Sequence, residues 1–136
     1  MTTDRPAAGI LDTSVFIASE TKRQLQTTLI PDEVATTVIT LAELNVGVLA
    51  ARTAETRARR LRTLDAVADM AALPVDEDAA QLWALLRVHL AETGRRVRIN
   101  DVWIAAIAAS KHLPVVTQDD DFDVLAGVAR LSIIRV

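Results

Sequence analysis

The chain has 136 residues, of which 51% are hydrophobic and 24% are charged, and its formal net charge is −3. This composition excludes a disordered chain, and the length predicts one globular domain spanning residues 1–136. The sequence has no cysteine, which excludes disulfides and thiolate metal sites. The two histidines, His89 and His112, lack the spacing of zinc or iron ligands. A metal site in this chain would therefore use oxygen ligands.

Nothing in the sequence suggests export or membrane insertion. The first nine residues lack the apolar core of a signal peptide, and no apolar stretch approaches the length of a membrane span. We therefore expect a soluble cytoplasmic protein with no membrane partner, and a chain without cysteine fits that reducing compartment.

Strand-like runs alternate with helical spacing along the chain. In chain order we expect a strand at 8–12, a helix at 13–20, a loop at 21–33, a strand at 35–39, helices at 41–50 and 53–69, a strand at 71–75, a helix at 78–93, a helix at 100–111, a strand at 114–117, a helical turn at 122–126 and a strand at 131–135. This alternation predicts an α/β fold with a parallel sheet covered by helices on both faces.

Two of the expected helices, 41–50 and 53–69, carry more apolar residues than one core face needs. In helix 53–69 we expect the arginines to face outward and the inward face to hold Ala54, Ala58, Leu61, Leu64 and Ala68. The additional apolar residues are Val46, Leu49 and Val67. They can form a groove for an amphipathic partner segment, or they can complete an ordinary core.

Four carboxylates lie at the junctions between expected elements. Asp12, Glu43 and Asp119 follow apolar β-like runs, and Asp101 opens the helix 100–111. Because the carboxyl ends of parallel strands form one crevice, these acids can converge. Like charges packed together repel, so such a cluster persists mainly when a hard cation neutralises it. The pattern predicts a magnesium-type acidic site.

Each acid also has a purely structural explanation. Asp12 can stabilise a helix N-terminus through the helix dipole, and residues 40–43 fit a capping box. Asn100 can cap a helix with Asp101 in its first turn, and Asp119 lies in an acidic run typical of turns. Taken singly, each explanation is as good as the metal-ligand interpretation. Four acids at one edge of the sheet favour the site.

Arginines gather in two segments. One holds Arg52, Arg57, Arg59, Arg60 and Arg62, and the other holds Arg95, Arg96 and Arg98. Guanidinium groups suit phosphate, although arginines at these positions can also be solvated helix faces. Aromatic residues make up only 3% of the chain, so a base-stacking platform is not expected. The second segment leads directly into Asp101, which predicts that at least one of its arginines lies near the acidic site and contacts nucleic acid.

Four short sequence blocks contain the acids and the polar residues next to them: 10–18 (ILDTSVFIA), 40–47 (TLAELNVG), 100–106 (NDVWIAA) and 116–122 (VTQDDDF). Together they resemble the PIN-domain family and, within it, the VapC-type toxins of toxin–antitoxin pairs. The resemblance covers nearly the whole chain. It implies a three-layer α/β/α sandwich on a mostly parallel five-stranded sheet, and a Mg²⁺ or Mn²⁺ endoribonuclease. It also implies a homodimer, a cognate VapB-like antitoxin and a structured RNA substrate such as transfer RNA or ribosomal RNA.

The resemblance also assigns roles to single residues. Asp12, Glu43 and Asp101 match the core acids, and Asp119 matches a more variable fourth acid. Asp121 is the alternative for the fourth acid. We favour Asp119 because Asp119 is closer to the strand end. The expected cation ligands are Asp12, Asp101 and Asp119, and Glu43 would hold a second cation or orient the attacking water. The polar residues that match positions around the acids are Thr13, Ser14, Asn100 and Thr117.

Two other interpretations remain open. An acidic crevice with Thr117 also suits a phospho-acceptor or phosphotransfer domain, but Lys111 precedes a strand rather than following one. A PIN-like binding module without catalytic activity is the second alternative, and the presence of all four acids argues against it. Trp103 is predicted to be a core residue beneath its helix.

Overall fold

The computed structural model describes residues 6–136. The first five residues lie outside this range, and they belong to the N-terminal segment that we expected not to be a signal peptide. The strands are β1 (Ala8–Leu11), β2 (Glu33–Thr37), β3 (Ala72–Leu73), β4 (Val115–Thr117) and β5 (Ile133–Arg135). The helices are α1 (Thr13–Glu20), α2 (Val38–Leu49), α3 (Ala54–Val67), α4 (Glu77–Thr93) and α5 (Ile99–Ser110). Three short 3₁₀ helices lie at Thr27–Leu29, Asp123–Leu125 and Val128–Arg130.

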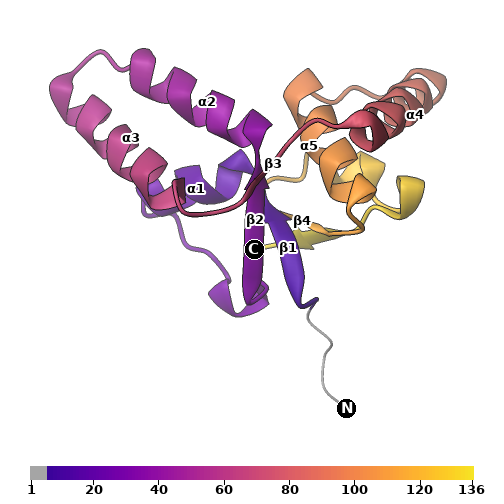
Figure 1. Ribbon diagram of the computed structural model, residues 1–136, viewed down its shortest axis with the longest axis horizontal. Coiled ribbons are helices and arrows are strands. Elements are labelled where there is room, and N and C mark those ends of the chain that lie inside the picture. Colours follow the sequence, from indigo (N-terminus) through magenta and orange to yellow (C-terminus); the bar gives the residue numbers. More distant parts are fainter. Residues whose placement is uncertain (1–5) are drawn as a thin grey trace.

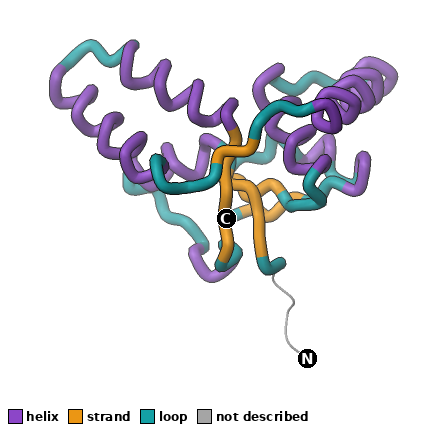
Figure 2. The backbone as a smooth tube through the Cα atoms, in the orientation of Figure 1, coloured by secondary structure: helices purple, strands orange, loops and turns teal. Residues whose placement is uncertain are grey.

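The described strands form one parallel sheet in the order β3-β2-β1-β4-β5. The sheet lies between the α2–α3 hairpin, drawn in purple and magenta in Figure 1, and the α4–α5 pair on the opposite side (Figures 1 and 2). This arrangement confirms the expected three-layer α/β fold. The central strand β1 pairs with β2 on one side and β4 on the other, so the carboxyl ends of three neighbouring strands lie together.

The core is centred on β1, β4 and α5. Gly9 of β1 lies so close to β4 that an added Cβ would stand 2.8 Å from Val116 Cγ2. A larger residue at position 9 would therefore separate the strands on which the site is built. Helix α5 is buried almost all round because the sheet and α4 cover it from two directions. Trp103 of α5 is half-buried and stacks on Trp83 of α4, with ring centroids 4.7 Å apart.

The junctions before α2 and α5 differ from the expected ones. Strand β2 ends at Thr37, two residues earlier than predicted, and α2 begins at once. The Thr37 hydroxyl accepts a hydrogen bond from the Thr40 N–H at 3.2 Å, so Thr37 caps the helix and a capping box at 40–43 does not form. Helix α5 begins at Ile99 with Arg98 as its N-cap, so the capping role expected of Asn100 is also wrong.

The inward face predicted for helix 53–69 is wrong. In α3 only Val67 is fully buried, Leu64 is partly buried, and Leu61 and the three alanines are exposed. The arginines instead turn toward the neighbouring helix: Arg57 donates to Ala51 O at 3.1 Å and Arg60 to Gly47 O at 2.6 Å. Gly47 lies in the last turn of α2 and Ala51 lies just beyond its end, where carbonyls lack partners within the helix, and these guanidinium groups donate to them. Across residues 6–136, none of the helices combines the length and apolarity that crossing a bilayer requires.

Candidate active site

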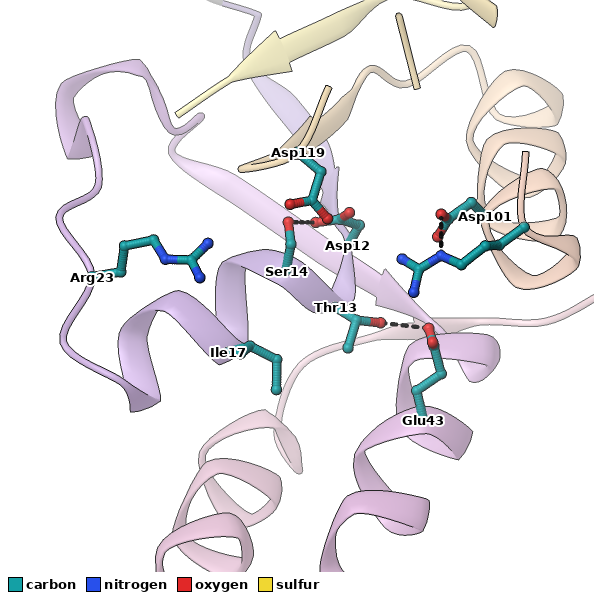
Figure 3. Close-up of a pocket in the computed structure, with 9 residues that line it drawn as sticks. Asp12, Thr13, Ser14, Ile17, Arg23, Glu43, Asp101 and Asp119 are labelled. Atoms are coloured by element: carbon teal, nitrogen blue, oxygen red, sulfur yellow. Dashed lines mark hydrogen bonds and ion pairs between the residues drawn. The ribbon is translucent and has the colours of Figure 1, made fainter. Parts of the chain in front are cut away.

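The predicted acids converge at the carboxyl ends of β1 and β4. Asp12 directly follows β1 and Asp119 lies two residues beyond β4, while Glu43 comes from α2 and Asp101 from α5 (Figure 3). They line one pocket of about 220 Å³. The residues that line it are Asp12, Thr13, Ser14, Ile17, Arg23, Glu43, Arg98, Asp101 and Asp119. Strand order, more than the local sequence around each acid, brings these side chains together.

Asp12 is held by two hydroxyl groups. Ser14 Oγ donates to Asp12 Oδ1 at 2.6 Å, and Thr117 Oγ1 donates to Asp12 Oδ2 at 2.9 Å. The same hydroxyls accept from the backbone, Ser14 from the Gln118 N–H at 2.9 Å and Thr117 from the Asp119 N–H at 3.0 Å. The turn after β4 is therefore tied to Asp12 through side chains that each donate one bond and accept another.

Burial makes ionisation of Asp12 costly. The residue is 3% exposed, and this burial raises the pKa of Asp12 from 3.8 to about 6. The hydrogen bonds from Ser14 and Thr117 lower that pKa, whereas the charges of Asp119 and Asp101 raise it further. A positive charge in the pocket would favour the ionised form of Asp12.

Glu43 is positioned by α1 as well as by its own helix. Thr13 Oγ1 donates to Glu43 Oε1 at 2.7 Å and lies 3.1 Å from the hydroxyl of the buried Thr40 (Figure 3). Glu43 therefore projects from the interior of α2 and not from a strand end, as the sequence had suggested. Because Thr13 opens α1, the position of Glu43 depends on how α1 packs against α2.

Asp101 is paired with a cation from its own helix terminus. Arg98 Nε donates to Asp101 Oδ2 at 3.2 Å, and an Arg98 terminal nitrogen (Nη2) lies 3.8 Å from Asp121 Oδ2. Burial raises the pKa of Asp101, and the charge of Arg98 opposes this rise. The charge of Asp101 in turn raises the pKa of Arg98, with smaller contributions from Asp121 and Glu43.

Not every residue predicted for the site lies in the pocket. Asn100 is exposed and outside its lining, and Asp121 reaches the site only through Arg98, so the geometry favours Asp119 as the fourth acid. Arg95 and Arg96 line other hollows near α4. Sequence reasoning missed Arg23, which projects toward the pocket from the loop after α1 and lies 3.5 Å from Gln118 Oε1 (Figure 3). A lone arginine in a polar loop gave no signal.

Within residues 6–136, no three histidine, aspartate or glutamate side chains approach one point closely enough to hold a single ion. Lysine is also absent from the lining of the acidic pocket, and Lys111 pairs with Asp76 at 3.1 Å at the start of α4. A phospho-acceptor domain would require a lysine beside the acids, and the lining of this pocket has none.

Comparisons with known proteins agree with the fold. A family model of the PIN domain matches residues 9–128. The chain is 71% identical over 131 residues to ribonuclease VapC5 of Mycobacterium tuberculosis, covering 96% of this chain and 97% of that protein. It is 39% identical over 124 residues to ribonuclease VapC4 of the same organism, covering 91% and 95%.

A solved structure adds the three-dimensional comparison. The crystal structure of VapBC-5 from M. tuberculosis, a member of the VapBC family of toxin–antitoxin systems, superposes with a TM-score of 0.91 and 69% sequence identity. The match covers 96% of this chain and 100% of that one. The acids, the sheet order and the extent of these matches lead to one conclusion: the chain belongs to the PIN-domain family, among the VapC ribonucleases.

Proposed function

We propose that this chain is the toxin of a toxin–antitoxin pair, a metal-dependent endoribonuclease that arrests growth. It would hydrolyse phosphodiester bonds of a structured RNA, such as transfer RNA or ribosomal RNA. The observation that carries the proposal is the convergence of four carboxylates on one pocket, in a chain 71% identical to a protein named ribonuclease VapC5. We also propose that the protein is cytoplasmic, where such RNA substrates are found.

The pocket fits a hard divalent cation, Mg²⁺ with Mn²⁺ as a substitute. Its donors are carboxylate and hydroxyl oxygens, which both ions prefer. A bound cation would also offset the cost of ionising Asp12, whose pKa is raised to about 6 by burial. We assign Asp12 and Asp101 as ligands, with Asp119 completing the shell directly or through water. The acids would have to draw closer than they are in this structure.

The remaining residues position the acids and the reacting groups. When bound, the cation would activate a water, polarise the scissile phosphate and stabilise charge on the leaving oxygen. Ser14 and Thr117 fix the direction of the Asp12 carboxylate. Glu43, held by Thr13, would orient the attacking water or a second cation. In-line attack by water needs no covalent enzyme intermediate, so no nucleophilic side chain is required.

RNA affinity would come from phosphate contacts, since the chain has little aromatic surface for base stacking. Arg98 lies in the lining of the pocket and is the nearest candidate. Arg95 and Arg96 would extend the contact along the RNA backbone, although they line separate hollows. Arg23 adds a cation on the side of the pocket away from Asp101 (Figure 3).

The proposed partners are a VapB-like antitoxin, which inhibits the nuclease, and a second copy of this chain. Val46 and Leu49 of α2 are 63% and 82% exposed, which suits an amphipathic antitoxin segment. Val67, the third residue predicted for that groove, is 1% exposed and belongs to the core. Growth inhibition should therefore be relieved when a cognate antitoxin is co-expressed.

The decisive test is controlled expression of the wild type and of Asp12→Asn, followed by sequencing of new 5′ ends in total RNA. The wild type should create discrete new ends in one structured RNA, and Asp12→Asn should create none. In vitro, cleavage by the wild type should require Mg²⁺ or Mn²⁺ and stop in EDTA. Full cleavage in excess chelator would contradict the proposed mechanism.

A further inference from the structure

Arg98 places a positive charge in the lining of the pocket that the proposed function assigns to a metal cation. Its guanidinium contacts the acid that the proposed function assigns to the metal: Nε lies 3.2 Å from Asp101 Oδ2. The Asp101 side chain is 5% exposed, so few other groups can reach it. The Arg98 guanidinium is thus already bound to Asp101, the carboxylate that the proposed function assigns to a divalent cation.

The ion pair between Arg98 and Asp101 is built so that it can be broken. The Arg98 side chain is 68% exposed and Asp121, its second partner, is 49% exposed, so only the Asp101 end of this ion pair is buried. Arg98 is also the N-cap of α5 and makes no side-chain capping bond there. Rotation of the Arg98 side chain into solvent would leave the helix and its backbone bonds unchanged.

A guanidinium and a divalent cation cannot both neutralise Asp101 without repelling each other at close range. The divalent ion carries twice the charge and binds several oxygens at once, whereas guanidinium holds Asp101 through one donated bond. The N-terminus of α5 adds positive potential at the same place, which disfavours a second cation there. Binding of a divalent ion at Asp101 should therefore expel Arg98.

We propose that Arg98 is an internal counter-ion of the acidic pocket, which holds Asp101 in the metal-free protein and is displaced when a divalent cation binds. Arg98 thereby weakens cation binding, because every binding event must break its ion pair with Asp101. This inference rests on the proposed metal site. The displaced guanidinium stays at the rim of the pocket, where a phosphate next to the scissile bond would meet it.

The test measures Mn²⁺ binding without RNA, by following the electron paramagnetic resonance signal of the free ion during titration. Arg98→Gln should bind Mn²⁺ about two- to fivefold more tightly than the wild type, because a partly exposed ion pair no longer has to be broken. Arg98→Lys keeps the charge and should stay closer to the wild type. The matched control is Arg96→Gln, an equal change of charge at an exposed residue outside the acidic pocket, and it should bind as the wild type does.

Thermal unfolding supplies a second measurement. In EDTA, Arg98→Gln should melt below the wild type because the clustered acids have lost their counter-ion, and saturating Mn²⁺ should remove that difference. A difference that is the same with and without Mn²⁺ would make Arg98 an ordinary surface ion pair and overturn the inference.

The outcomes separate this inference from the proposed function. Equal or weaker Mn²⁺ binding by Arg98→Gln, with binding by the wild type intact, would overturn the counter-ion role and leave the metal site standing. Failure of both proteins to bind Mn²⁺ would overturn the metal site and the inference together.

Discussion

The two sides of the acidic pocket are held in different ways. On the sheet side, Asp12 is buried and bonded to two hydroxyls that are themselves bonded to backbone N–H groups. On the helix side, Asp101 is held by the exposed guanidinium of Arg98. Salt and divalent ions compete with an exposed ion pair but scarcely affect buried hydrogen bonds. The sheet side therefore fixes the geometry of the pocket, and the helix side sets its charge.

The largest effect should come from removing an acid on either side. Asp12→Asn and Asp101→Asn keep the shape of the side chain but remove a proposed ligand, and each should lower RNA cleavage by about a thousandfold or more. The measurement is single-turnover cleavage, with circular dichroism to check the fold. Asp65→Asn, on the exposed side of α3, is the control and should cleave as the wild type does. Retained Mg²⁺-dependent cleavage by Asp101→Asn would show that the helix side contributes no ligand.

The second effect concerns stability and belongs to the sheet side. Between about pH 4 and pH 6, folded Asp12 keeps a proton that the unfolded chain has released, because its folded pKa is raised to about 6. The free energy of unfolding should therefore fall as the pH rises through this window and level off above it. The total loss from Asp12 is about 3 kcal/mol at most.

Asp12→Asn should not show this loss. In EDTA its stability relative to the wild type should increase from pH 4 to pH 8, as measured by urea unfolding at each pH. Curves that stay parallel over this range would mean that Asp12 ionises at its ordinary pKa and that the sheet side is less buried than the structure indicates.

The difference between the two sides also explains what the sequence could predict. Asp12, Asp101 and Asp119 follow or begin well-marked apolar segments, and parallel strands place such positions at one edge. Their convergence could therefore be predicted. The direction of each carboxylate depends on hydroxyls such as Thr117, which is 105 positions from Asp12 in the sequence and donates to it at 2.9 Å. Local spacing carries no information about such a hydrogen bond.

The predictions from sequence were wrong where tertiary contacts override the local preference of a segment for strand or helix. The β-branched run after Thr37 suggested a longer strand, but the Thr37 hydroxyl caps a helix there and moves Glu43 into its second turn. In α3, helical periodicity placed the alanines inside and the arginines outside. Instead, Arg57 and Arg60 donate to carbonyls in the last turn of α2 and just beyond its end, and a hydrophobic pattern does not report such hydrogen bonds.

The third prediction tests RNA binding on the helix side. Replacing Arg95, Arg96 and Arg98 with alanine should weaken RNA affinity about tenfold or more and lower the salt slope by roughly one for each phosphate that the protein no longer neutralises. Arg98→Ala alone should account for much of this effect, since Arg98 is the one of these three arginines that lines the acidic pocket. Affinity is measured at several salt concentrations in an Asp12→Asn background to prevent cleavage. Identical salt slopes for all proteins would mean that RNA enters from another side.

The smallest effects should come from two neighbouring hydroxyls that hold different acids of the pocket. Ser14 donates to Asp12 at 2.6 Å and accepts the Gln118 N–H, whereas Thr13 donates to Glu43 at 2.7 Å. Ser14→Ala would remove the donor to Asp12 Oδ1 and the acceptor of the Gln118 N–H, while Thr117 would still donate to Asp12 Oδ2, at a cost of about 1–3 kcal/mol in the free energy of unfolding. Thr13→Val keeps its shape and removes one bond to a half-buried acid, at a cost of about 1 kcal/mol.

The pH dependence distinguishes the two variants more sharply than stability at one pH. The Ser14 hydroxyl lowers the pKa of Asp12, so Ser14→Ala should raise that pKa further and extend the loss of stability above pH 6. Thr13→Val does not touch Asp12, so its unfolding curves should stay parallel to those of the wild type across the same pH range. Urea unfolding in EDTA at several pH values measures both. If Ser14→Ala also ran parallel to the wild type, the hydroxyl network would not control ionisation of Asp12, and the sheet side of the pocket would owe its properties to burial alone.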